Sequence, residues 1–354
     1  MSLLLSRVSK FRLGEPALLR RSYFRLLSSG FSSSMLQTPA CSIARAEPCG
    51  DDLGKLVIRI DNEYCDTYLE KKVPLELMNE MVTVGASHGW VATLKEDGIV
   101  RLQDDLNPVA SDTNPKRIAL PPLVTLPHCQ TKVVTNVAMS TSSPEDEDCV
   151  VAVKFLGPQL SLCRPAQCKW TNIMIKNPCF FSSRVMFSEK DDMFRMPGSG
   201  GHLIGSWDRL GKQHKFQRLQ FKNLPELTKA KRELLYSCSV SEHLVESRTT
   251  CETFLVKWFR KANPKCLSKM KTRGVMVFKL EEQGKAVYTQ DIGELNIFIS
   301  KSEAFCLPAG SIPSNFVELL DFDEMTNVCL DGYFIGPGNF TSMAPYFIPP
   351  QNKI

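Results

Sequence analysis

The sequence lacks the usual signatures of metal sites, phosphate-binding loops and membrane spans. Its 13 cysteines include no Cys-x-x-Cys pair, and neither His-x-His nor His-Glu-x-x-His occurs. Gly198-Ser-Gly-Gly201 and Gly336-Pro-Gly338 do not have the spacing of a phosphate loop, so we interpret both as turns. No apolar run approaches the roughly 18 residues that cross a membrane. We therefore predict no cofactor, no bound metal and no membrane span.

Histidine is scarce, which limits the acid–base chemistry that the chain could support. The five histidines are His88, His128, His202, His214 and His243. His88 and His202 each precede an apolar strand, and we expect histidines in that position to be structural or solvated. We find no catalytic motif, and we predict that the protein is not an enzyme.

The chain also lacks a net charge of either sign when residues 1–34 are left out of the count. Six of the 43 basic residues and one of the 38 acidic residues lie in residues 1–34, which leaves 37 of each. A neutral domain lacks the basic footprint of nucleic-acid binding. Two stretches, 212–222 and 257–273, are locally basic and contain Phe216, Phe221, Trp258 and Phe259 among the charges. We interpret both as solvated strand or loop faces.

Residues 1–34 have the composition of an organelle transit peptide, because they are rich in Arg, Ser and Leu and nearly free of acids. Between residues 17 and 27, apolar residues share one helical face and arginines lie opposite. Arginine density favours the mitochondrion, with the chloroplast or dual import as alternatives, and cleavage is expected between Tyr23 and Met35. The predicted targeting residues are Arg7, Lys10, Arg12, Arg20, Arg21 and Arg25.

Cysteine and tryptophan are both expected in the core. The cysteines are scattered singly and no secretory signal precedes them, so we predict that most are reduced, small core residues. The tryptophans lie at or beside predicted strands, and we favour core packing over exposed anchors for a partner. The residues concerned are Cys149, Cys238, Cys306 and Cys329 in apolar runs, and Trp90, Trp170, Trp207 and Trp258.

Strand patterns dominate the rest of the chain. Short β-branched or aromatic runs predict strands at 55–60, 89–94, 149–155, 253–259, 275–278 and 296–299. Tight turns at 95–98, 189–192 and 300–303 predict hairpins. These units recur every 35 to 60 residues or so, which is typical of the four-stranded blades of a propeller. Only 71–82 and 224–235 look helical, too few for an α/β fold.

The predicted organisation has three parts. Residues 1–34 are a cleavable targeting segment, 35–52 a polar linker, and 53–354 a single all-β, propeller-like domain with few short helices.

Several blocks then resemble a known family. They include Ser87-His-Gly-Trp-Val-Ala-Thr93, Ile118-Ala-Leu-Pro-Pro122, Cys168-Lys-Trp-Thr-Asn172 and Asp291-Ile-Gly-Glu294. Their order from about residue 81 to 334 is similar to the plant domain-of-unknown-function 295 family, an F-box-associated domain also described as a KIB-type β-propeller. The resemblance implies a propeller and supplies no catalytic motif.

Several members of that family carry an N-terminal F-box and act as substrate adaptors of ubiquitin ligases. This sequence has a targeting segment instead and no F-box-like, Leu-Pro-rich helical segment before Gly85, which suggests an organellar branch. We therefore expect a non-enzymatic protein-interaction module of a plant organelle. The alternatives are an organellar RNA-binding protein that gathers Lys212, Lys215, Arg218, Lys222 and residues 257–273 on one face, an F-box-type adaptor, and a hydrolase or lyase at the propeller channel.

Overall fold

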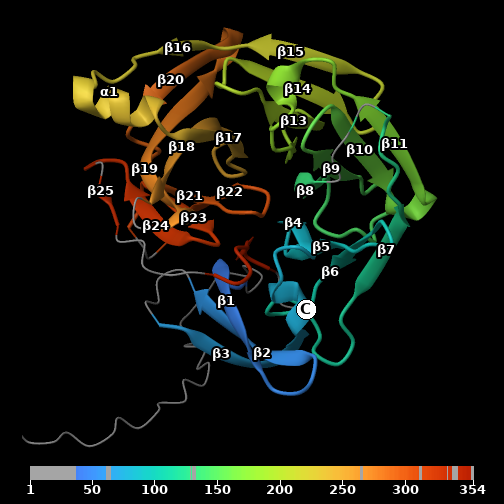
Figure 1. Ribbon diagram of the computed structural model, residues 1–354. Coiled ribbons are helices and arrows are strands. Elements are labelled where there is room, and N and C mark those ends of the chain that lie inside the picture. The colour runs from blue at the N-terminus through green and yellow to red at the C-terminus, as the bar shows by residue number, and fades with distance from the viewer. Residues whose placement is uncertain are drawn as a thin grey trace, which may run out of the picture. The chain divides into compact units, whose positions relative to one another are not determined.

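Six β-sheets arranged in a ring form the domain, so the prediction of an all-β propeller is confirmed (Figure 1). The structure is a computed structural model that describes residues 37–60, 65–127, 129, 133–263, 266–310, 313–332, 334–336 and 342–351. The chain divides into two units, Met1–Met35 and Leu36–Ile354. The first unit, with the six predicted targeting residues, lies outside the described residues, as does His128.

Blades 1 to 3 each have four strands, which are named in order from the channel outward. Blade 1 joins the two ends of the domain: β26 (Phe347–Ile348), β1 (Cys41–Pro48), β2 (Leu53–Ile60), β3 (Thr67–Pro74). Blade 2 contains β4 (Thr83–Ser87), β5 (Trp90–Leu94), β6 (Ile99–Gln103), β7 (Arg117–Pro122). Blade 3 contains β8 (Val134–Met139), β9 (Val151–Phe155), β10 (Gln159–Arg164), β11 (Lys169–Met174).

Blade 4 also has four strands, whereas blades 5 and 6 have five. Blade 4 contains β12 (Met186–Ser188), β13 (Met193–Pro197), β14 (Leu203–Asp208), β15 (His214–Arg218). Blade 5 contains β17 (Ser239–Glu246), β18 (Thr253–Asn263), β19 (Cys266–Glu281), β20 (Lys285–Thr289) and the parallel outer strand β16 (Gln220–Lys222). Blade 6 contains β22 (Phe305–Pro308), β21 (Leu295–Ile299), β23 (Phe316–Asp321), β24 (Glu324–Cys329), β25 (Phe334–Ile335).

Helical elements in the described residues are short. They are α1 (Lys229–Tyr236), η1 (Leu75–Met78), η2 (Pro165–Gln167), η3 (Pro178–Phe180) and η4 (Glu282–Gly284). The predicted helix at 224–235 is confirmed only from Lys229, after the N-cap Thr228, whose hydroxyl accepts from the Lys231 amide. The predicted helix at 71–82 is wrong: its first residues end β3, and only η1 follows.

The predicted linker at 35–52 is also wrong. Residues Cys41–Pro48 form β1, which pairs with β2 along its whole length. On its inner side β1 pairs with β26 at Cys41↔Ile348 and Ser42↔Phe347. The C-terminus thus supplies the innermost strand of the blade that the N-terminal part of the domain begins, which closes the ring.

Burial along each strand follows its place in its blade. The middle strands β9 and β21 are buried at every position, because neighbouring blades cover both of their faces. The outer strand β15 is exposed at every position. Six buried apolar clusters occupy the six junctions between neighbouring blades. Apolar burial at these junctions is the main stabilising contribution to the ring.

Most of the predicted core residues are found at these junctions. Trp90, Trp207 and Trp258 are buried, and Trp170 packs partly buried between blades 2 and 3, so the core interpretation of the tryptophans is confirmed. The cysteine prediction is only partly right. Of the cysteines whose side chains the structure describes, five are buried, three are half-buried and four are exposed. The buried ones are Cys41, Cys129, Cys149, Cys163 and Cys306, and the exposed ones are Cys49, Cys65, Cys168 and Cys251.

Candidate functional site: the central channel

The six inner strands run in one direction, which gives the channel two distinct ends. Residues that follow the inner strands, or end them, meet in one pocket of about 700 Å³, to which every blade contributes. The contributors include His88, Ser142, Glu189, Arg248, Pro308 and Gln351. We call the face with this pocket the lower face. The face at which the inner strands begin is the upper face.

A connection from blade 6 closes the channel between these faces. Residues 300–304, which we call the plug, join β21 to β22. The Ser302 hydroxyl donates to the Phe347 carbonyl of blade 1 (2.9 Å), and the Glu303 amide donates to the Ala86 carbonyl of blade 2 (2.7 Å). In Figure 1 this connection projects from β21 and β22 into the centre of the ring.

A buried carboxyl group anchors the plug. Glu303 Oε2 accepts a hydrogen bond from the Ser87 hydroxyl (2.6 Å), and Oε1 accepts from the Phe187 amide (2.7 Å). Burial raises the pKa of Glu303 to about 7, since a charged carboxylate is costly away from water. Glu303 thus links blade 6 to blades 2 and 4 at the axis of the ring.

At the lower mouth the polar side chains form hydrogen bonds and an ion pair with one another. Arg248 can only donate, so its contact with His88 Nε2 (2.8 Å) makes that nitrogen an acceptor. The proton of a neutral His88 then lies on Nδ1, which donates to the Ser87 hydroxyl (2.9 Å). Burial, and secondly the charge of Arg248, lower the pKa of His88 to about 4. Arg248 also pairs with Glu189 at 2.6 Å.

The sequence carries a pattern here that our sequence analysis missed. Gly85-Ala-Ser-His-Gly89 matches the Gly-x-Ser-x-Gly of hydrolases. That pattern normally forms a turn from strand to helix, whereas here it joins β4 to β5. The structure explains why glycine occupies both positions. A Cβ on Gly85 would lie 2.8 Å from the Val137 amide of blade 3, and Gly89 has φ +87° in the hairpin turn.

The geometry of Ser87, His88 and Glu303 also differs from that of a catalytic triad. In a triad the histidine lies between the serine and the acid and takes the proton of the serine. Here the serine lies between the histidine and the acid, and His88 donates to it. The Ser87 hydroxyl also accepts from the Met139 amide (3.1 Å), which leaves it 3% exposed. These contacts are those of a buried, hydrogen-bonded hydroxyl that holds neighbouring blades together.

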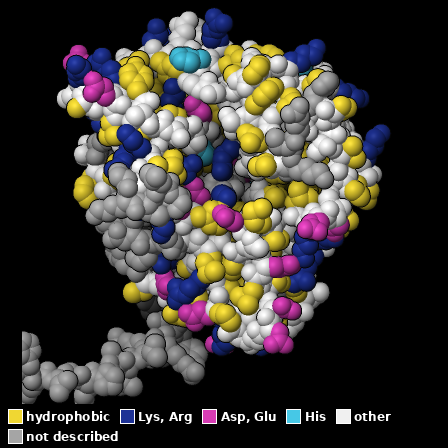
Figure 2. Space-filling model, in the orientation of Figure 1, with side chains coloured by type: hydrophobic (Ala, Val, Ile, Leu, Met, Phe, Trp, Pro, Cys, Tyr) yellow, Lys and Arg dark blue, Asp and Glu magenta, His cyan; other side chains and the backbone are white. Residues whose placement is uncertain are grey.

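The upper mouth differs in charge. Arg184, Arg260 and Lys301 lie close enough to influence one another. Arg260 pairs with Asp321, and Lys301 Nζ lies 3.9 Å from the centroid of the Phe322 ring. Figure 2 shows Lys or Arg and His side chains in a hollow at the centre of the ring.

His243 adds no charge to the upper mouth. Burial and the neighbouring Arg184 and Arg260 hold its pKa well below the usual value, and its Nε2 is 3.0 Å from the Ser241 hydroxyl. Besides Asp321, the exposed Glu80 is the other acid that influences Lys301. Three cations therefore face one partly buried and one exposed carboxylate.

Exposed apolar side chains also gather on the upper face. Of the fourteen large apolar side chains exposed in the described residues, ten lie at strand ends or connections of that face. They are Leu53, Met81, Val124, Val133, Leu156, Met174, Leu224, Tyr236, Val240 and Met343. Met81, Val133, Tyr236 and Met343 come just before inner strands, so we call these four the apolar rim of the upper mouth.

The two predicted basic stretches differ in how exposed their side chains are. Residues 212–222 run along β15 and β16, the outer strands of blades 4 and 5, where their lysines and arginine are exposed, as predicted. Lys257 is not a solvated side chain. Its Nζ donates to the Gly200 carbonyl (2.8 Å) and lies 4.1 Å from the centroid of the Phe221 ring, within the packing between blades 4 and 5.

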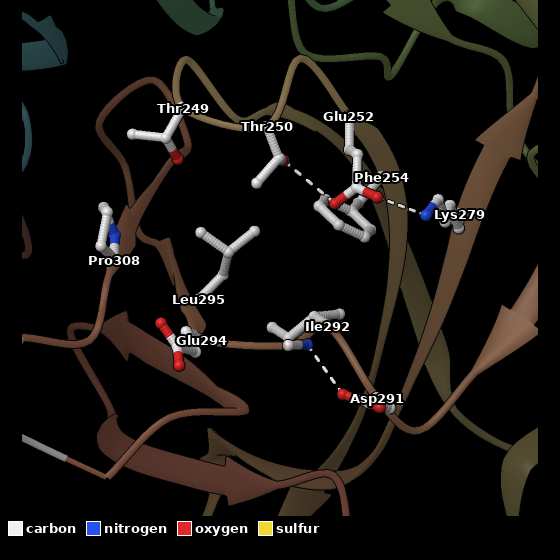
Figure 3. Close-up of a pocket in the computed structure, with 11 residues that line it drawn as sticks. Thr249, Thr250, Glu252, Phe254, Lys279, Asp291, Ile292, Glu294, Leu295 and Pro308 are labelled. Carbon is white, nitrogen blue, oxygen red and sulfur yellow. Dashed lines mark hydrogen bonds and ion pairs between the residues drawn. The ribbon is translucent and has the colours of Figure 1, made fainter.

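A second, smaller pocket lies between blades 5 and 6 at the lower face (Figure 3). Its volume is about 500 Å³. Lys279 pairs with Glu252, which also accepts from the Thr250 hydroxyl (3.0 Å). Asp291 accepts from the Gly293 amide (2.7 Å). Neither histidine nor cysteine is among its described lining residues.

Two further kinds of site are absent from the described residues. These residues contain no group of three or more His, Cys, Asp or Glu side chains that could hold a metal ion. None of the helices in this part of the chain is long and apolar enough to span a membrane.

Comparison with known proteins identifies the family. The profile described as "KIB1-4 beta-propeller" matches residues 58–333. That match spans most of the chain, which therefore belongs to the KIB1-4 β-propeller family. No curated protein matched the sequence.

The similar solved structures are distant. A chain of a nidogen/laminin complex is 8% identical, with a TM-score of 0.40 over 88% of this chain and 97% of that one. The dihydro-heme d1 dehydrogenase NirN in complex with DHE is 11% identical, with a TM-score of 0.34 over 91% and 76%. Likenesses at this level say nothing about function.

Proposed function

We propose that this chain is a non-enzymatic protein-interaction module of a plant organelle, with the mitochondrion favoured, and that its partner docks on the upper face. The observation that carries the proposal is the coincidence on one face of the apolar rim and the charged upper mouth. Interface centres combine apolar anchors with a few charged groups. The lower face offers fewer exposed apolar side chains and charges that already pair with one another.

The organelle part of the proposal rests on residues 1–34 and is tested by N-terminal sequencing of the endogenous protein from fractionated cells. A mature end between about Tyr23 and Met35 in the mitochondrial fraction supports import. A protein that begins at Met1 or Ser2 in the cytosol would overturn it and favour the ubiquitin-ligase adaptor.

The docking part is tested by placing a photo-crosslinking residue at Tyr236 of the apolar rim or, as control, at Tyr68 of the lower face. Both tyrosines are exposed, at 83% and 59%. In isolated organelles we expect one protein adduct at position 236 and none at position 68. Equal labelling at both positions would contradict the proposal, and an RNA adduct would favour the RNA-binding alternative.

A further inference from the structure

The upper mouth contains more positive charge than its own acids balance. Arg260 is matched by Asp321, at side-chain exposures of 23% and 22%. Asp321 also influences Arg184 and Lys301. The one further acid that influences Lys301 is the exposed Glu80. Burial lowers the pKa of both cations, which shows that desolvation costs their charged forms free energy. An anion bound at the mouth would offset that cost.

The donors are also held in place. Arg184 Nη1 donates to the Ser300 carbonyl of the plug (2.8 Å), a bond that uses one of its five N–H donors. Arg260 lies over the Trp258 ring, with 4.3 Å from Cζ to the centroid. Groups positioned before binding lose little conformational entropy when a ligand arrives.

The plug limits the depth of the site. Because residues 300–304 are bonded to blades 1, 2 and 4, a ligand that arrives from the upper face meets a closed floor beneath Arg184 and Lys301. A short side chain fits such a site better than a chain threaded through the channel.

The surroundings distinguish a peptide from a nucleic acid. The apolar residues of the rim precede the inner strands, with Glu80 beside Met81, and farther out the upper-face connections carry further exposed acids. These further acids are Asp51, Asp52, Glu96 and Asp97, the last of which pairs with Arg101. The exposed cations Lys95, Lys176, Lys229 and Arg232 share the upper-face connections with these acids, so the outer surface carries mixed charge. The apolar rim beside the cations of the mouth is what favours a carboxylate flanked by apolar residues over a chain of phosphates. Guanidinium groups bind carboxylates through paired hydrogen bonds.

We propose that the upper mouth binds an aspartate or glutamate side chain of the partner protein, flanked by apolar residues, through Arg184, Arg260 and Lys301. This inference rests on the proposed function and names the chemistry by which the partner is recognised.

The test uses the folded full chain and a fluorescent peptide of about eight residues, in which one central glutamate is flanked by leucines and the other positions are glycine or serine, in anisotropy titrations. The comparison peptide has glutamine in place of glutamate. A charged hydrogen bond has a net value near 1.5–3 kcal/mol, so we expect at least about tenfold weaker binding of the glutamine peptide. Affinity for the glutamate peptide should fall when salt rises from about 50 to 200 mM.

Variants assign the effect to the mouth. Lys301→Met and Arg260→Met should each weaken the glutamate peptide by about tenfold, and Lys301→Arg should restore most of the affinity. Lys215→Met, an exposed lysine of the outer strand β15, is the matched control and should change nothing. If Arg260→Met fails to fold, Lys301→Met still decides the question.

The results separate the two proposals. Equal binding of the two peptides, or full affinity in Lys301→Met, would overturn the acidic-residue site, and tighter binding of an oligouridylate would overturn it in favour of nucleic acid. If the protein adduct at position 236 persists in those cases, the docking face stands and only its chemistry is wrong. If no protein adduct forms at position 236 but the chain still prefers the glutamate peptide, the docking face would be rejected and the acidic-residue site would stand.

Discussion

The two mouths of the channel are built on the same six inner strands, yet their charges are arranged in opposite ways. At the lower mouth His88, Arg248 and Glu189 form a continuous series of contacts, and Glu246 accepts from the Ser188 hydroxyl (2.5 Å) and the Lys190 amide (3.1 Å). At the upper mouth three cations share two acids. The unbalanced charge of the upper mouth is the reason why we propose that end of the channel, and not the lower mouth, as the binding end.

The plug keeps the two mouths apart. It belongs to blade 6, whose order is altered because β22 follows β21 but lies inside it. The connection that makes this inversion is the one that crosses the ring. One feature of topology therefore produces both the floor of the upper site and the buried Glu303.

The largest effect should come from removing the anchor between the mouths. Glu303→Ala leaves the Ser87 hydroxyl and the Phe187 amide without their acceptor in a buried position, and should lower the free energy of unfolding by about 3 kcal/mol. Glu303→Gln keeps the shape and one acceptor and should cost about half as much. Urea denaturation measures both. An alanine variant as stable as the wild type would mean that the plug is not held by this carboxyl group.

The same carboxyl group should make stability depend on pH. The pKa of Glu303 rises from 4.5 to about 7 on folding, so its contribution is present below pH 4.5 and is lost as the pH rises through about 7. At about 1.4 kcal/mol per pH unit, the free energy of unfolding of the wild type relative to Glu303→Gln should fall by about 3 kcal/mol over that window, so the wild type should be the more stable protein at pH 4.5 and the less stable one at pH 7.

Urea midpoints of both proteins at several pH values measure this difference. The lowered pKa values of His88 and His243 act in the opposite direction below pH 6.5, but they act in both proteins and cancel. A difference independent of pH would show that Glu303 is ionised in the folded state at all these pH values.

A smaller effect on stability should follow from removing one of the acids of the upper mouth, which increases its excess of positive charge. Asp321→Asn leaves Arg260 without its carboxylate and should cost about 1–2 kcal/mol of stability, because the pair is only partly buried. It should also strengthen binding of the glutamate peptide several-fold. Weaker peptide binding in a folded Asp321→Asn protein would contradict the charge argument.

The smallest effect is expected at the lower mouth. Arg248 and Glu189 are 60% and 52% exposed, so Arg248→Gln should change stability by less than about 0.5 kcal/mol. NMR titration should show the pKa of His88 rising from about 4 but staying below 6.5, since burial is the larger cause of its shift. A stability loss as large as that of Asp321→Asn would erase the contrast between the mouths.

Local patterns were enough to predict individual hairpins. Alternation and turn residues located β5 with β6, β12 with β13, and β21 with β22, because these pairings are between near neighbours in the chain. They failed for β1, whose Cys-Ser-Ile-Ala-Arg-Ala-Glu-Pro is not rich in β-branched or aromatic residues. That strand is stabilised by pairing with β26, about 300 positions away, and no local pattern reports such a partner.

The candidate site was less predictable than the fold. Gly85-Ala-Ser-His-Gly89 was available as a motif, but only the structure shows the serine between His88 and Glu303. Arg184, Arg260, Lys301 and Asp321 are spread over nearly 140 residues, and nothing in their spacing links them.

By itself, the sequence determined that the chain folds as blades of antiparallel strands and that tryptophans fill the spaces between them, since both follow from local periodicity and apolar burial. The tertiary structure alone decided how the ring closes, which connection plugs it and which end is left with positive charge. Those features depend on through-space contacts between residues of different blades, and electrostatic energy depends on distance in space, not on separation along the chain.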